Sequence, residues 1–100
     1  MTVISAMLIR MRREQVLRQI ERLQSRIAFL RRVRAVLGGW RNADSDAFMA
    51  RVEQLIRDLQ DMVEALEEYA RVLEASARDY ETTQERVIGA ANDLISPRGR

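Results

Sequence analysis

The sequence predicts an all-α protein: an antiparallel helix-turn-helix hairpin that dimerises into a four-helix bundle. Two long segments place apolar residues at alternating steps of three and four, the spacing of one helix face. One short glycine-containing segment separates them, and the chain has more apolar positions than two helices cover. A chain of 100 residues is enough for one small domain, which we expect over residues 1–95.

The first helix is expected over about residues 3–37, where neither proline nor glycine occurs. Arg13 and Arg34 are the polar members of its apolar series. The apolar members are Ala6, Ile9, Val16, Ile20, Leu23, Ile27, Leu30 and Leu37.

The turn is expected over residues 38–44. Gly38 or Gly39 can adopt the left-handed conformation that ends a helix, and Asp44 or Ser45 can cap the next one. Because the connection is short, the two helices must run antiparallel. Acidic residues near the start of the second helix and arginines near the end of the first also suit the helix dipoles.

The second helix is expected over about residues 45–95, followed by a flexible basic tail, 96–100, after Pro97 ends the helix. Antiparallel matching pairs its start with the end of the first helix and leaves residues beyond about Thr83 overhanging. Its expected packing line is Phe48, Val52, Leu55, Leu59, Met62, Leu66, Tyr69, Leu73, Ser76, Tyr80, Thr83, Val87, Ala90 and Leu94.

Both helices also carry apolar residues beside this line, and a second hairpin is the expected cover for them. On the second helix these include Ala70, Ala77 and Ala91. The candidates for the dimer interface are Ile4, Leu8, Met11, Phe29, Val36, Ile56 and Val63.

Charge divides the chain in two. Residues 1–37 hold nine arginines against two glutamates, a net +7, and residues 43–95 hold five arginines against thirteen acids, a net −8. We expect these halves to pair with each other. An arginine-rich nucleic-acid-binding hairpin is an alternative, but the acidic helix cancels much of the field, so no nucleic-acid partner is expected.

Histidine and cysteine are absent, which removes the usual metal ligands, thiol nucleophiles and histidine bases. We therefore expect a non-enzymatic protein without catalytic residues, cofactor or metal. No stretch approaches the roughly 20 apolar residues of a membrane span, so no stable membrane insertion is expected. At the N-terminus the apolar run precedes the arginines, the reverse of a cleavable secretory signal.

The segment G-W-R-N-A-D-S-D-A-F places a tryptophan at the hairpin and an aromatic residue eight positions later. With the length near 100 and the later stretch L-E-E-Y-A-R-V-L-E-A-S-A-R-D-Y, it resembles the WXG family, also called ESAT-like proteins, of bacterial type VII secretion. The turn motif then comprises Gly39, Trp40 and Asn42, where Asn42 replaces the glycine of the family.

This resemblance implies a secretion substrate, a virulence factor or an effector carrier that acts by protein–protein interaction. Such a protein is made in the bacterial cytoplasm and secreted without a cleavable signal peptide. Its partners would be a second copy or a related WXG-type chain, and a type VII secretion ATPase or a larger effector. The alternative is an intracellular coiled-coil adaptor or scaffold.

Two aromatic sites have two interpretations each. Trp40 is either a plug at the corner of the bundle or, as the resemblance implies, a recognition surface. Tyr80 is either a packing residue or part of an export signal. The family's signal has an acid four residues after the tyrosine, where this chain has Gln84, and the acid, Glu85, follows one residue later.

Overall fold

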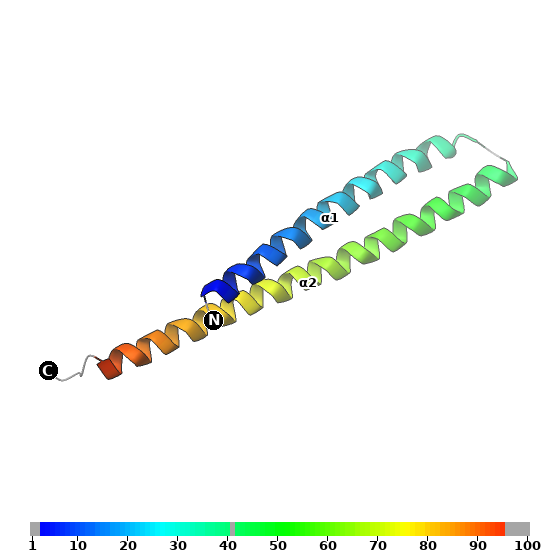
Figure 1. Ribbon diagram of the computed structural model, residues 1–100. Helices are drawn as coiled ribbons and strands as arrows, with labels where there is room; N and C mark the ends of the chain where they lie inside the picture. The colour runs from blue at the N-terminus through cyan, green and yellow to red at the C-terminus, as the bar shows by residue number, and fades with distance from the viewer. Residues whose placement is uncertain (1–2, 41, 96–100) are drawn as a thin grey trace. The chain divides into compact units, whose positions relative to one another are not determined.

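The computed structural model describes residues 3–40 and 42–95, and the side chains of 5–40 and 42–94. It has two helices, α1 (Val3–Leu37) and α2 (Ala43–Ile95), joined by a short turn (Figure 1). The predicted all-helical class and hairpin are confirmed, and α2 begins two residues before the expected position 45. The expected tail, 96–100, lies outside the described residues.

The chain divides into two compact units. Unit 2 is Val16–Tyr69 and contains the turn, and unit 1 consists of Met1–Gln15 and Ala70–Arg100. In each unit a stretch of α1 runs antiparallel to a stretch of α2. Each unit therefore has its own set of residues between the helices, which we call the packing seam.

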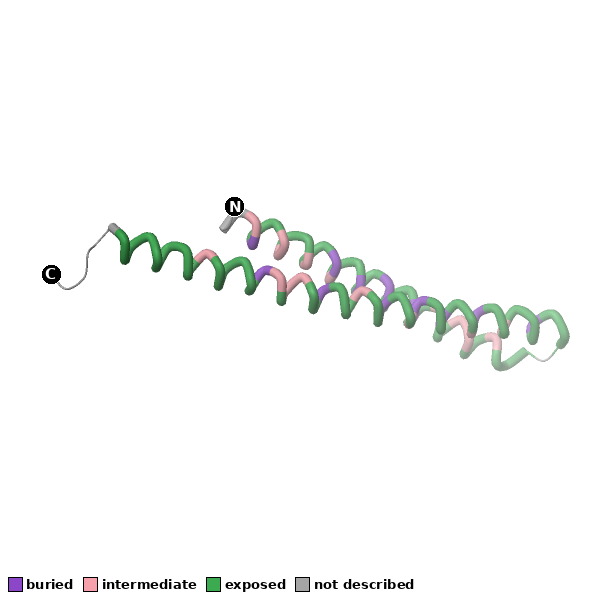
Figure 2. Tube along the Cα trace, turned by 90° about the horizontal axis from the view of Figure 1, so that it is seen from below, coloured by how far each residue is buried: buried purple, intermediate pink, exposed green. Residues whose placement is uncertain are grey.

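The seam of unit 2 consists of branched aliphatic side chains. Successive members are three or four residues apart on each helix, so one face of each is buried (Figure 2). The buried residues are Val16, Ile20, Leu23 and Ile27 of α1 with Val52, Ile56, Leu59 and Val63 of α2.

The seam of unit 1 is built from small side chains. Ala6 of α1 and Ala70 and Ala77 of α2 are buried, and Ala77 is 0% exposed. Side chains this small let two helix backbones approach closely. Beyond Ala77, every described side chain of α2 is exposed except that of Gln84, which is half-buried.

The predicted packing face of α1 is confirmed, because Ala6 and the four seam residues of unit 2 are buried and Ile9, Leu30 and Leu37 are half-buried.

The predicted face of α2 is wrong in part. Val52 and Leu59 are buried as expected, but Phe48, Leu55, Met62 and Tyr69 are exposed. The expectation that Ile56 and Val63 lie beside the seam, available to a second chain, is corrected by their burial within this chain.

Hydroxyl groups give a physical reason for the difference. The expected line contains Tyr69 and Ser76, whose hydroxyls would need hydrogen-bond partners inside an apolar seam. The line that is buried has Ala70 and Ala77 at the adjacent positions, and alanine makes no such demand. Because Val52 and Leu59 belong to both lines, α2 is rotated from the expected orientation by roughly 50°, half of the 100° that one residue turns a helix.

The position of Ile56 provides a test of this seam. Ile56 is 3% exposed, so Ile56→Ala should lower the free energy of unfolding by about 2–5 kcal/mol. The matched control is Ile88→Ala, because Ile88 is half-exposed and a surface change typically stays within about 0.5 kcal/mol. Urea unfolding followed by circular dichroism measures both, and equal losses would contradict the assigned seam.

Candidate functional site

The turn after α1 is closed by backbone hydrogen bonds. Gly38 N–H donates to the carbonyl of Arg34 (3.0 Å), Gly39 N–H to that of Val36 (3.2 Å) and Trp40 N–H to that of Leu37 (2.9 Å). The expectation of a left-handed glycine is wrong, because the φ angles of Gly38 and Gly39 lie outside the left-handed region. The tightened last turn satisfies these carbonyls without it.

Asn42 caps the start of α2 together with Ser45. Ser45 N–H donates to Asn42 Oδ1 (2.8 Å), and Asn42 N–H donates to Ser45 Oγ (3.2 Å). Such a reciprocal pair across three residues is a capping box, which satisfies two otherwise free donors at a helix start. The expectation that Asp44 or Ser45 caps this helix is wrong, because Asn42 is the capping residue and Ser45 is its partner inside the first turn. The predicted acids Asp44 and Asp46 occupy the first turn of α2.

Trp40 lies between these two sets of hydrogen bonds. Its N–H is bound to Leu37, and its carbonyl lies 3.3 Å from the hydroxyl of Ser45, which also donates to Asn42 O (3.0 Å). The residue is nevertheless 61% exposed in this single chain, and its two interpretations, a plug at the corner of the four-helix bundle and a recognition surface, both stay predictions. The backbone is fixed while the indole faces solvent.

A shallow groove of about 450 Å³ lies at this turn. Trp40 and Phe48 provide its aromatic walls, and the capping residues Asn42 and Ser45 contribute polar groups. Phe48 is itself 53% exposed. Of the predicted turn motif, Trp40 and Asn42 line the groove, whereas Gly39 supports it through its backbone.

Phe48 also begins a row of large apolar residues along α2 in unit 2. Phe48, Leu55, Met62 and Tyr69 are spaced by seven residues, so they lie on one helix face, and they are 40–53% exposed. We call these four residues the exposed stripe. It is about 30 Å long, and a solvent-exposed apolar row of this size is typical of an interaction surface.

The predicted interface residues of α1 are also exposed. Leu8 and Met11 belong to unit 1, and Phe29 and Val36 belong to unit 2. Arg32 lies over the ring of Phe29, with the guanidinium 5.9 Å from the ring centre. The side chain of the remaining candidate, Ile4, lies outside the described residues.

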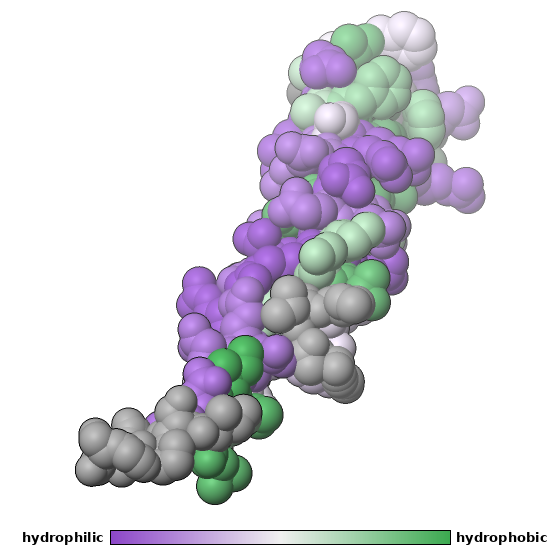
Figure 3. Space-filling model, turned by 60° about the vertical axis from the view of Figure 1, so that its left-hand side comes forward, coloured by the Kyte–Doolittle hydropathy of each residue, from purple (hydrophilic) through white to green (hydrophobic). Residues whose placement is uncertain are grey.

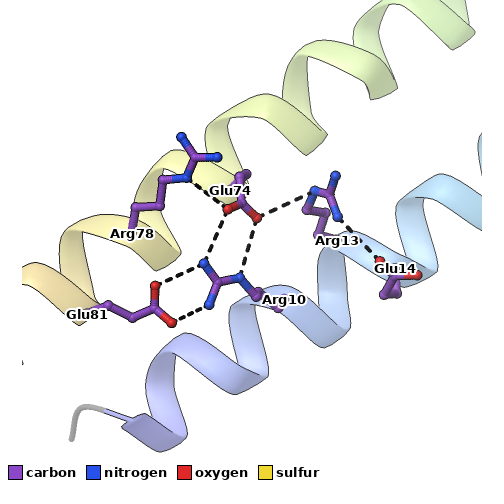
Figure 4. Close-up of polar contacts among 6 residues, drawn as sticks. All are labelled: Arg10, Arg13, Glu14, Glu74, Arg78 and Glu81. Carbon is purple, nitrogen blue, oxygen red and sulfur yellow. Dashed lines mark hydrogen bonds and ion pairs between the residues drawn. The ribbon is translucent and has the colours of Figure 1, made fainter.

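Charged side chains gather where α1 and α2 meet in unit 1 (Figure 4). Arg10 of α1 donates two hydrogen bonds to each of two carboxylates of α2, Glu74 and Glu81. Glu74 also accepts from Arg78 (3.0 Å) and pairs with Arg13 (3.7 Å). The expected pairing of the oppositely charged halves therefore occurs here, and we call these five residues the Arg10 cluster.

The cluster alters the acidity of its members. Hydrogen bonds from Arg10 lower the pKa of Glu74 and the pKa of Glu81, because they favour the charged carboxylates. The bonds to Glu81 and then to Glu74 raise the pKa of Arg10 above its ordinary value. Sequence reasoning missed these particular residues, although the opposite net charges of the two halves were a signal for such pairing.

Of the predicted export residues, Tyr80 lies between the cluster residues Arg78 and Glu81, and Glu85 lies one helical turn beyond Glu81. Tyr80 is 44% exposed, so it lies outside the seam between α1 and α2 in this chain, and its two interpretations, a packing residue of the bundle and part of an export signal, stay predictions. Glu85 is exposed and lines a shallow groove of about 580 Å³ with Glu81 and Ile88. Since each residue turns a helix by about 100°, Tyr80 and Glu85 face different directions, whereas Gln84 shares the side of Tyr80.

The described residues contain neither a membrane-spanning helix nor an acidic site for a metal ion. Within 3–40 and 42–95, neither helix has an apolar stretch long enough to cross a bilayer. Over the same ranges, acidic side chains form no group of three that is suited to hold a metal ion.

The length, the turn and the tryptophan match a known family. A family model described as WXG100, proteins of 100 residues with WXG, matches residues 5–85. The chain belongs to the WXG100 family. Comparison with curated proteins gives no significant match, and neither does comparison with solved structures.

Membership confirms the resemblance seen in the sequence. The WXG100 name describes a glycine two positions after the tryptophan, where this chain has Asn42. The capping box explains how the turn accommodates the change, because the side chain of asparagine provides the acceptor that a glycine lacks.

Asn42 can be tested through helix stability. Asn42→Ala removes the acceptor of the capping box and should lower the free energy of unfolding by about 0.5–2 kcal/mol, whereas Asn42→Asp should retain it. The matched control is Asn92→Ala at an exposed position of the same helix. Urea unfolding measures all three, and an unchanged Asn42→Ala would contradict the capping role.

The Arg10 cluster should make unit 1 sensitive to acid. Because the pKa values of Glu74 and Glu81 are lowered by folding, their stabilisation is fully present above the ordinary glutamate pKa of about 4.3 and is lost as the pH falls through the lower folded values. Thermal melting by circular dichroism between about pH 7 and pH 2.5 should therefore show the decrease below about pH 4. Glu81→Gln should reduce this decrease, and Glu53→Gln in unit 2 is the control; equal decreases in both variants would contradict the assignment.

Proposed function

We propose that this protein is a non-enzymatic type VII secretion substrate, acting as a virulence or effector-carrier factor through protein–protein contacts. Membership of the WXG100 family supports the system, and the exposed Trp40 carries the proposal for this chain. A protein gains little stability from a tryptophan held 61% in solvent by a fixed backbone, which is the arrangement expected of a recognition group.

The proposed assembly is a dimer that buries the exposed stripe in a four-helix bundle. The partner is a second copy or a related WXG-type chain, and it would cover Phe48, Leu55, Met62 and Tyr69. Burying a fully exposed side chain of this kind contributes roughly 1.5–3 kcal/mol, and these four, which are 40–53% exposed, have about half of that still to gain, enough to offset part of the entropy lost on association. Leu8, Met11, Phe29 and Val36 of α1 remain proposed interface residues.

The proposed route is synthesis in the cytoplasm followed by secretion without a cleavable signal peptide. Trp40 and Asn42 at the turn form one recognition surface. The helical segment around Tyr80 and Glu85, which face different sides of α2, forms a second, recognised by the type VII secretion ATPase or by a larger effector. The exposure of Trp40, Tyr80 and Glu85 supports this assignment, because a secretion partner can contact them without unfolding the protein.

The dimer can be tested at the exposed stripe. The purified chain should sediment as a dimer at micromolar concentration, and Met62→Glu should make it monomeric while helicity is kept, because a carboxylate is costly to bury unpaired. The matched control is Leu94→Glu, at an exposed position outside the stripe, which should remain dimeric. A wild-type monomer, or a dimeric Met62→Glu variant, would overturn the proposed interface.

Export tests the function itself. In a bacterial host with an active type VII system, Trp40→Phe and Tyr80→Ala should reduce the secreted fraction while melting stays close to that of the wild type. Thr82→Ala, at an exposed position near Tyr80, is the control and should be secreted normally. Normal secretion of both folded variants would count against both recognition surfaces and would favour the adaptor alternative.

A further inference from the structure

Arg10 acts at the place where α2 loses its packing partner. Ala77 is the last buried residue of α2 among the described side chains, and Glu81 follows one helical turn later on the same side. Arg10 of α1 binds Glu81 across this boundary. Its contact therefore lies next to Tyr80, at the start of the overhanging part of α2.

The geometry of Arg10 suits it to hold two successive turns of α2. Its Nε and Nη2 donate to the two oxygens of Glu74 (3.4 and 3.2 Å), while Nη1 and Nη2 donate to those of Glu81, the latter at 3.0 Å. Paired bonds between a guanidinium and a carboxylate fix orientation as well as distance. Since Glu74 and Glu81 are seven residues apart, the contact restrains the helix on both sides of Ala77.

The roles of the two carboxylates differ. Glu74 retains Arg78 and Arg13 as partners if Arg10 is removed. Glu81 is bound to α1 by the paired hydrogen bonds from Arg10. Loss of Arg10 should therefore release the turn that contains Tyr80 and Glu81 more than the turn that contains Glu74.

We propose that Arg10 is a positioning residue that holds the Tyr80–Glu85 segment of α2 as an oriented helix for the partner that recognises it. The inference rests on the proposed function, because it assumes that a secretion partner recognises this segment. Arg10 lies on α1, some seventy positions before this segment in the sequence, and its contact keeps the segment ordered.

The low stability of an unpacked helix explains why the contact between Arg10 and Glu81 matters. Residues 82–95 lie beyond the contact, and Val87, Ile88 and Leu94 there are exposed. Figure 3 shows apolar patches, in green, at the surface near this end of the chain. Unpacked helices of fewer than about 12–15 residues are marginal in water, and Gly89 weakens this one further. A restraint at Glu81 reduces fraying towards Tyr80, so that a partner meets a segment already ordered and less ordering entropy is lost on binding.

The test combines hydrogen exchange with export of the full chain. Arg10→Gln and Glu81→Gln should speed amide exchange within residues 78–94 by roughly two- to fivefold, the range that exposed ion pairs give, and should reduce export. Exchange within residues 46–69 should stay unchanged, as should the melting temperature to within a few degrees. Arg12→Gln is the matched control, because Arg12 donates to Gln15 on its own helix. Arg10→Lys keeps the positive charge but loses the paired hydrogen bonds of the guanidinium, so its amide exchange and its export should lie between those of the wild type and of Arg10→Gln.

The possible outcomes separate the positioning role from the recognition surface. Unchanged exchange in residues 78–94, or changed exchange with normal export while Tyr80→Ala is blocked, would overturn the positioning role. If Tyr80→Ala is itself exported normally, the proposed recognition surface is wrong, and the exchange data still decide whether Arg10 orders the segment. If Arg10→Gln loosens residues 46–69 as well, Glu81→Gln becomes the deciding variant, because it leaves Arg10 bound to Glu74. Faster exchange within residues 78–94 together with reduced export of Glu81→Gln then supports the positioning role, and unchanged exchange or normal export overturns it.

Discussion

A pair of helices buries only the side chains that lie between them. On α2, two adjacent lines of apolar residues run along the helix, and α1 is wide enough to cover only one of them. In unit 2 the seam takes Val52, Ile56, Leu59 and Val63, and this choice leaves the exposed stripe in solvent. The orientation of α2 therefore determines the surface that is available for association. The proposed dimer follows from this one geometric constraint.

Much of the fold could be predicted because helix boundaries depend on local chemistry. Glycine and proline limit both helices, and regular spacing identifies the packing face of α1. The face of α2 was mistaken because Val52 and Leu59 belong to both candidate lines, so spacing alone does not separate them. The hydroxyls of Tyr69 and Ser76 were the available signal, since a seam with Ala70 and Ala77 buries no polar group.

The sequence predicts which positions form the candidate site, but not the exposure and the hydrogen bonds of those residues. The sequence marks Trp40 and Asn42, yet the exposure of the indole depends on hydrogen bonds that fix the backbone on both sides of it. The capping box replaces a left-handed glycine by side-chain chemistry that only the local geometry reveals. The Arg10 cluster depends on which residues become neighbours across the helices, and such pairing requires knowledge of the register.

Thiol labelling offers the most direct test of which line of α2 is buried, because the chain has no cysteine of its own and each introduced thiol is unique. Leu55→Cys and Ile56→Cys are neighbours on opposite sides of the boundary between the seam and the exposed stripe. The reaction with a maleimide should be slow for Ile56→Cys at every protein concentration. It should be fast for Leu55→Cys in dilute solution and become slow as the protein associates. Fast labelling at position 56 together with slow labelling at position 55 in dilute solution would contradict the account.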